Sequence, residues 1–129
     1  MKKHTPAALR AELVNHPYSS NPDYFSRINF FHFSPDRKLV SYYWEAPPGI
    51  IPLHYEQFDE LIFLLEGQLE IRSASGTQSF GPGDVLEISR TDGDLEFRIA
   101  TTVKAIGYVY PVDEQEYQNI ARLMQGRSY

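Results

Sequence analysis

The sequence predicts a single-domain, all-β fold in which antiparallel hairpins close into a barrel, with a short helix before the barrel and a longer helix after it. Turn-forming residues recur at close intervals between Arg27 and Tyr110, and the segments between them show no helical period. Aromatic residues make up 14% of the chain, a composition that favours strands. The length of 129 residues suits one compact domain with its own core.

The N-terminal region, residues 1–26, is expected to hold a short helix followed by a loop. Thr5 suits the N-cap and Pro6 the first helical position, and the apolar residues that follow share one face, so we expect a helix over about 6–14. Residues 15–26 are rich in Asn, Pro, Ser and Asp and show no period, which predicts a loop.

The barrel itself is expected over residues 27–112. Turn signals divide this region into short segments that are too closely spaced for units in which helices alternate with strands. The clearest signals are S-P-D-R at 34–37, A-P-P-G at 46–49, A-S-G-T at 74–77, G-P-G-D at 81–84 and T-D-G-D at 91–94.

The C-terminal region, residues 113–129, is expected to be mainly helical. Asp113 and Glu116 have the spacing of a capping box, and Gly126 marks the expected end of the helix. The apolar side chains between them share one face of that helix: Tyr117, Ile120, Ala121 and Met124.

The charge and composition narrow the possible partners. A formal net charge of −5 leaves no excess of Lys and Arg for phosphate groups, so we expect no nucleic acid partner. The chain has no cysteine, which excludes disulfides and thiolate chemistry. Because no apolar segment is long enough to span a membrane and the first residues lack the core of a signal peptide, we expect a cytoplasmic protein without membrane association.

A candidate site lies in the segment G-I-I-P-L-H-Y-E-Q-F-D-E-L-I-F-L-L-E-G at 49–67. In a strand, the side chains of His54 and Glu56 point the same way. The polar residues at 57–59 can reverse the chain, and Glu60 then shares a face with Ile62 and Leu64. If the two faces coincide, one imidazole and two carboxylates converge, which indicates a metal site or an acid/base site.

This segment resembles the first motif of the cupin superfamily, with Gly49, His54, Glu60 and Gly67 in register. The G-P-G-D-V-L segment at 81–86 resembles the turn that leads into the second cupin motif. The resemblance covers about residues 38–112. It implies the cupin-type double-stranded β-helix, a jelly-roll barrel.

The site departs from the usual cupin pattern. Glu56 stands where the second histidine is normal, and Asp94 stands at the histidine position of the second motif, counted from Gly83. The four histidines of the chain end at His54, so the resemblance does not extend to a three-histidine centre. The remaining set of His54, Glu56, Glu60 and Asp94 suits Mn²⁺, Fe²⁺, Mg²⁺ or Zn²⁺, but protons could compensate the carboxylates instead of a metal.

Among cupins, the sequence most resembles the ethanolamine-utilisation Q-type family. The resemblance rests on D-E-L-I-F-L-L-E-G at 59–67 and on Y-V-Y-P-V-D-E at 108–114. An acetate kinase activity is attributed to that family, but no segment of this chain resembles a phosphate cradle. We therefore infer kinship without carrying over the activity.

We expect a ligand pocket lined by Tyr42, Trp44, Ile62 and Tyr108, with aromatic rings beside a few polar groups. Barrel core or a dimer interface is the alternative interpretation of these aromatic residues. An edge strand and aromatic surface left uncovered by a barrel of this length also predict a homodimer.

Two functions remain open. The first is a small enzyme that performs acid/base chemistry of the isomerase, lyase or cyclase type on a small organic molecule, with His54, Glu56 and Glu60 as catalytic residues and a possible divalent metal. The alternative is a non-catalytic module of the ethanolamine-utilisation type that binds a small molecule or serves in assembly. In that case His54 and Glu60 could be a structural ion pair.

Overall fold

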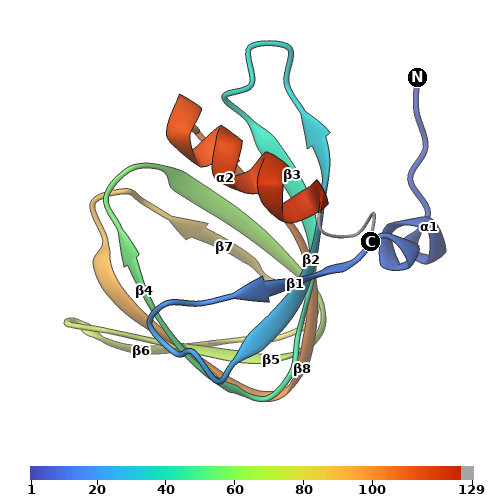
Figure 1. Cartoon of the computed structure of the whole chain (residues 1–129). Helices are drawn as coiled ribbons and strands as arrows, with labels where there is room; N and C mark the ends of the chain where they lie inside the picture. Colours follow the sequence, from blue (N-terminus) through green and yellow to red (C-terminus); the bar gives the residue numbers. More distant parts are fainter. Residues whose placement is uncertain (126–129) are drawn as a thin grey trace.

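The chain forms a barrel of eight antiparallel strands with one helix at each end of the sequence, as a computed structural model of residues 1–125 describes (Figure 1). This confirms the predicted all-β cupin-type fold with terminal helices. The elements are α1 (Pro6–Ala11), β1 (Val14–Pro17), β2 (Phe25–Phe33), β3 (Val40–Ala46), β4 (Gly49–Tyr55), β5 (Asp59–Ser73), β6 (Gly76–Phe80), β7 (Val85–Ile88), β8 (Gly93–Tyr110) and α2 (Glu114–Gln125).

The two longest strands, β5 and β8, hold the barrel together. The sheet runs β1-β2-β3-β8-β5-β6, while β4 also pairs with β8 and β7 also pairs with β5. Strand β5 changes register with β8 around Gly67. Gly67 has a φ of +88°, and a Cβ there would collide with the carbonyl oxygen of Thr102, so a residue without a side chain is required. This irregularity lets one strand serve both parts of the barrel.

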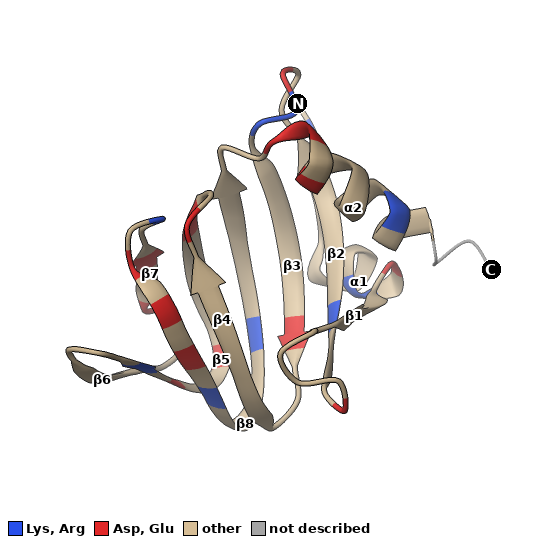
Figure 2. Cartoon of the chain, turned by 60° about the vertical axis from the view of Figure 1, so that its left-hand side comes forward, with Lys and Arg blue, Asp and Glu red and all other residues tan. Residues whose placement is uncertain are grey.

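The core fills most of the barrel interior. Alternate strand residues turn inward, and burying their side chains supplies the main stabilisation of the fold. The fully buried residues include Val40, Ala46, Ile51, Leu64, Val103 and Ala105. Figure 2 shows that the charged residues are sparse on the strands, which leaves most of the sheet without charge.

The N-terminal region differs in part from the expectation. Thr5 caps the helix as predicted, because its side chain accepts a hydrogen bond from the Ala8 amide at 3.1 Å. The helix ends at Ala11 rather than near residue 14, and the expected loop over 15–26 is wrong for its first residues. Strand β1 pairs with β2, and this pairing overrides the local turn composition.

Helix α2 confirms the predicted C-terminal helix over the described residues. The Glu116 amide donates to the Asp113 carboxylate at 2.8 Å, and Ile120 and Met124 are buried. The expected end at Gly126 lies outside the described residues. The predicted division into an N-terminal region, a barrel and a C-terminal region, with boundaries after residues 26 and 112, stays a prediction. No helix within residues 1–125 is long and apolar enough to cross a membrane.

Candidate functional site

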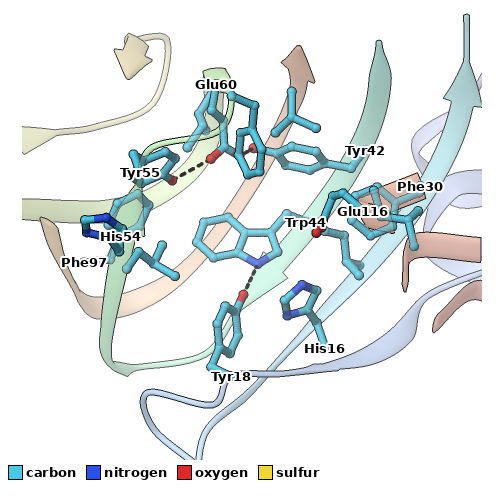
Figure 3. Close-up of a pocket in the computed structure, with 16 residues that line it drawn as sticks. His16, Tyr18, Phe30, Tyr42, Trp44, His54, Tyr55, Glu60, Phe97 and Glu116 are labelled. Atoms are coloured by element: carbon cyan, nitrogen blue, oxygen red, sulfur yellow. Dashed lines mark hydrogen bonds between the residues drawn. The ribbon is translucent and has the colours of Figure 1, made fainter. Parts of the chain in front are cut away.

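A cavity of about 230 Å³ opens into the barrel between the sheet and helix α2 (Figure 3). Its wall is mainly aromatic and aliphatic, and its polar groups are few. Of the described residues that line it, none is Lys or Arg. The lining residues are His16, Tyr18, Ile28, Phe30, Tyr42, Trp44, Leu53, His54, Tyr55, Phe58, Glu60, Ile62, Phe97, Val109, Glu116 and Ile120.

Glu60 is the central polar residue of this cavity. The Tyr42 hydroxyl donates a short hydrogen bond to one carboxylate oxygen, and the Tyr55 hydroxyl donates to the other at 2.6 Å. Figure 3 shows the two phenols meeting the carboxyl group from two different strands, β3 and β4. We call Tyr42, Tyr55 and Glu60 the lumen cluster. It brings one acid and two hydroxyl groups to the surface of the cavity.

Burial shifts the titration of the whole lumen cluster. It raises the pKa of Glu60 above its ordinary value of 4.5, although the hydrogen bonds from the two phenols act in the opposite direction. Burial also raises the pKa of Tyr42 and Tyr55 well above 10, and the neighbouring Glu60 charge adds to this. The phenols therefore stay protonated donors near neutral pH, and Glu60 keeps its proton to a higher pH than an exposed glutamate does.

The sheet register holds the lumen cluster in place. Tyr42 lies opposite Gly107 in the β3–β8 pair. A Cβ at Gly107 would lie 2.6 Å from the Tyr42 hydroxyl and would also collide with the carbonyl oxygen of Leu61. Gly107 thus leaves the space through which Tyr42 reaches Glu60.

A second group of polar residues lies across the cavity, close to helix α2. The Trp44 indole donates to the Tyr18 hydroxyl at 3.3 Å, and Tyr18 and Ser26 share a hydrogen bond of 2.7 Å. His16 stacks at a tilt on Tyr18, with ring centroids 4.5 Å apart. Burial lowers the pKa of His16, although backbone groups of His16 and Pro17 act in the opposite direction. Its buried Nδ1 atom makes no hydrogen bond of ordinary geometry with the described residues.

Sequence reasoning did not assign eleven of the 16 lining residues to the site. His16 and Tyr18 fall in the segment that was expected to be a loop, where no period signals a strand. Tyr55 had a signal, because Ile51, Leu53 and Tyr55 are apolar at alternate positions and so mark the inward face of β4. The other missed residues are Ile28, Phe30, Leu53, Phe58, Phe97, Val109, Glu116 and Ile120.

His54 and Glu60 both line the cavity, but they have different hydrogen-bond partners and do not form the joint group expected from the sequence. His54 lies at the rim of the cavity with half of its side chain exposed, because strand alternation turns Tyr55 inward in its place. Its Nδ1 contacts Asp94 at 2.6 Å and its Nε2 contacts Glu56 at 3.1 Å. We call His54, Glu56 and Asp94 the rim cluster. These contacts raise the pKa of His54.

The expected metal set of His54, Glu56, Glu60 and Asp94 does not fit one ion. Asp94 and Glu56 contact opposite nitrogens of the same imidazole ring, and Glu60 hydrogen-bonds two phenols instead. Within residues 1–125, no three side chains of His, Asp or Glu are grouped closely enough to hold a metal ion. The donors therefore do not fit the expected Mn²⁺, Fe²⁺, Mg²⁺ or Zn²⁺ site.

The expected pocket residues divide by the alternation of their strands. Tyr42, Trp44 and Ile62 lie in the cavity wall. Tyr108 does not, because it alternates with the inward Gly107 and Val109 and is exposed on the outer face. The expectation of Tyr108 as a pocket residue is therefore wrong.

Comparisons with known proteins agree with this architecture. The EutQ-like cupin domain matches residues 33–105. A comparison with curated protein sequences finds no match.

Similar solved structures include two that carry the ethanolamine-utilisation name. One is described as an ethanolamine utilization protein Q of Salmonella typhimurium LT2, with a TM-score of 0.66, 19% identity, and 77% of this chain and 80% of that chain covered. The EutQ protein of Clostridium difficile has a TM-score of 0.64 and 17% identity over 81% of this chain and 79% of that one.

An enzyme is also among the similar structures. Ectoine synthase from P. lautus has a TM-score of 0.66 and 16% identity, and the match covers 93% of this chain and 85% of that chain. At these identities the three structures show that the fold is shared.

Proposed function

This chain belongs to the EutQ-like cupin domain family of the cupin superfamily, and from that premise we propose that it binds a small organic molecule in the barrel cavity. One observation carries the proposal. The Glu60 carboxyl group, held by Tyr42 and Tyr55, faces a cavity whose wall is otherwise largely aromatic and aliphatic. An apolar wall with a few fixed polar groups is the usual composition of a small-molecule site.

The cost of placing a carboxyl group there supports a role in binding. Burying a carboxylate without a cationic partner costs several kcal/mol in typical proteins, or the group must hold a proton instead. An apolar residue at position 60 would avoid this cost and fill part of the cavity. Burial is also the cause of the raised pKa of Glu60. The buried carboxyl group therefore lowers the stability of the fold, and ligand binding would offset that loss.

Acid/base catalysis is a second candidate function, favoured by the direction of the Glu60 pKa shift. A carboxyl group whose pKa is raised toward neutrality can take a proton from a substrate and return it later. His16, whose pKa is lowered, offers a neutral imidazole in the same cavity. Isomerase, lyase or cyclase chemistry at Glu60 would use these two groups. The rim residues His54 and Glu56 would have no direct part.

We also propose the homodimer expected from the sequence. The outer face of the sheet carries exposed apolar side chains, which suit a contact with a second copy of the chain. Light scattering at micromolar concentration tests this, and a monomer would contradict it. The exposed residues of this face are Phe63, Leu65, Val85, Tyr108 and Tyr110.

Trp44 allows a direct test of binding in the cavity, because it is the only tryptophan of the chain and lies in the cavity wall. A library of small metabolites is screened by thermal shift, and the hits are titrated by Trp44 fluorescence. We expect hits that lose most of their affinity in Glu60→Gln. Glu66→Gln is the matched control, since Glu66 lies on the same strand but is exposed and pairs with Lys104 at 3.3 Å.

The experiment separates the two functions. Hits that bind Glu60→Gln as tightly as the wild type would contradict a lumen site centred on Glu60. Hits that are converted to product, with a rate lost in Glu60→Gln, would assign catalysis. Binding without turnover would assign the non-catalytic function.

A further inference from the structure

We propose that the ligand of the barrel cavity is a small organic cation whose charged nitrogen lies beside Glu60. This inference rests on the proposed binding function and specifies the class of molecule that the cavity takes. It is carried by the partners of Glu60, the charges of the lining residues and the arrangement of aromatic rings.

The first observation is the partner set of Glu60. Both carboxylate oxygens accept hydrogen bonds from phenols, and none of the ion pairs of residues 1–125 involves Glu60. Two neutral donors reduce the cost of a buried carboxylate but leave its charge uncompensated. A ligand cation would supply the missing positive charge.

The second observation is the charge of the cavity wall. Over the described residues the wall contains two carboxylates, Glu60 and Glu116, and neither Lys nor Arg. Burial lowers the pKa of His16, so that imidazole is neutral near neutral pH. An anionic ligand would meet these carboxylates with neither Lys nor Arg to bind it, and His54, the imidazole of raised pKa at the rim, already contacts Asp94 and Glu56. A cation would be attracted to both carboxylates.

The third observation is the set of rings around the carboxyl group. Cations bind favourably to the faces of Trp, Tyr and Phe, and the interaction is strongest where water is excluded. The Tyr42 and Tyr55 rings flank Glu60, and Trp44 lies beside them in the wall (Figure 3). The other Phe and Tyr rings of the wall are Tyr18, Phe30, Phe58 and Phe97. Such a wall holds an alkylammonium group better than a polar neutral molecule.

The unpaired nitrogen of His16 gives the cavity a further polar position. Its Nδ1 atom is buried and makes no hydrogen bond of ordinary geometry across the described part of the chain. A buried polar atom of this kind is usually satisfied by a ligand or water when the site is filled. A ligand with an ammonium group and a second polar group would reach both Glu60 and His16.

Binding of a cation should also be linked to release of a proton. Below the pKa of Glu60 the free protein holds a proton there, and a cation in the cavity favours the ionised form. The titratable groups that line the same cavity as Glu60 are Tyr42 on β3, Tyr55 on β4, Tyr18, His16, Glu116 on α2 and His54 at the rim. The pKa values of Tyr18, Tyr42 and Tyr55 are raised, so these phenols contribute no proton near neutral pH.

Matched probes test the proposal through Trp44 fluorescence and calorimetry. Choline is compared with its neutral isostere 3,3-dimethyl-1-butanol, and butylammonium with 1-butanol and butanoate. We expect at least one cation to bind about tenfold more tightly than its neutral isostere. Glu60→Gln should abolish this preference, and Glu66→Gln should keep it. Titrations in two buffers of different ionisation enthalpy should show proton release that Glu60→Gln removes.

Each contrary outcome has a distinct meaning. Neutral or anionic probes that bind as tightly as the cations would overturn the inference but leave the proposed lumen site standing. Failure of all five probes at millimolar concentration would overturn the inference as well. If the metabolite library also gave no hit, the proposed function would fall with it. Because Glu60→Gln could disturb folding, Tyr55→Phe provides a second variant, with a reduced preference expected.

Discussion

The lumen cluster and the rim cluster share one short segment, residues 54–60, and each adds one residue from another strand, yet their environments differ. Tyr55 and Glu60 face the cavity, where burial raises the pKa of the carboxyl group. His54, one residue before Tyr55, lies at the rim with Asp94, whose side chain is 93% exposed. The same kinds of groups thus become a candidate site on one face and a solvated ion pair on the other.

This comparison shows that the face of the strand on which a residue lies, more than its type, decides whether an ionisable group is buried in the cavity or exposed to water. At the rim, water screens the charges and the ion pairs contribute little. Inside the barrel, water is largely replaced by protein, and each carboxylate and hydroxyl acts more strongly. Variants of adjacent residues can therefore test the assignment of each cluster.

The largest contrast is expected between Tyr55→Ala and His54→Ala. Tyr55 is buried and donates to Glu60, so truncation removes core packing and leaves the carboxyl group with one donor. We expect Tyr55→Ala to lower the free energy of unfolding by about 3 to 5 kcal/mol. His54→Ala should leave it nearly unchanged. Urea unfolding measures both, and equal losses at the two positions would contradict the strand faces described above.

Removing a single hydroxyl should give an intermediate effect. Tyr42→Phe keeps the buried ring but removes one donor to Glu60, which should cost about 1 to 3 kcal/mol at neutral pH. It should also raise the pKa of Glu60 further, since the lost hydrogen bond favours the ionised form. Tyr108→Phe is the control, because Tyr108 is exposed on the outer face. A loss as large in Tyr108→Phe would count against the lumen cluster.

Glu60→Gln should change how stability depends on pH. The pKa of Glu60 is raised in the folded chain, so the wild type loses stability as pH rises from about 4.5 through the folded pKa. Glutamine does not titrate, so the free energy of unfolding of Glu60→Gln should rise relative to that of the wild type over this pH interval. Urea unfolding across pH tests this, with Glu66→Gln as control. If the free energies of unfolding of the wild type and Glu60→Gln changed in parallel with pH, the raised pKa of Glu60 would be refuted.

His54→Gln should have the smallest effect. The pKa of His54 is raised by its contacts with Asp94 and Glu56, so its contribution is present below about pH 6.5 and lost as pH rises through the folded value. Because the group is exposed, added salt should weaken even this contribution. Melting temperatures at about pH 6 and about pH 8 measure it. A large loss at either pH would show that the rim cluster is structural.

Sequence reasoning reached the fold because turn signals and the glycine frame are local. A glycine is required at position 67 by the positive φ and by the close approach of Thr102. That glycine can be recognised in the sequence. The side chain of Glu60 was also placed on the face shared with Ile62 and Leu64, which both turn inward.

The site was harder to predict because it depends on the strand pairing. The resemblance favoured His54, while the apolar alternation of Ile51, Leu53 and Tyr55 pointed to the opposite phase of β4. His16 enters the cavity only because β1 pairs with β2, a contact that the turn-like composition of that segment conceals. Pairing between distant segments is not encoded in local composition.

The most direct test of the lumen cluster is a titration of the glutamate side-chain carboxyl carbons by NMR, with Glu60→Gln used to assign the Glu60 resonance. A resonance that titrates above 4.5, that is absent in Glu60→Gln and that is unchanged in His54→Ala is the result expected for a buried Glu60. A Glu60 resonance that titrates at or below 4.5, or that moves with the protonation of His54, would contradict the account.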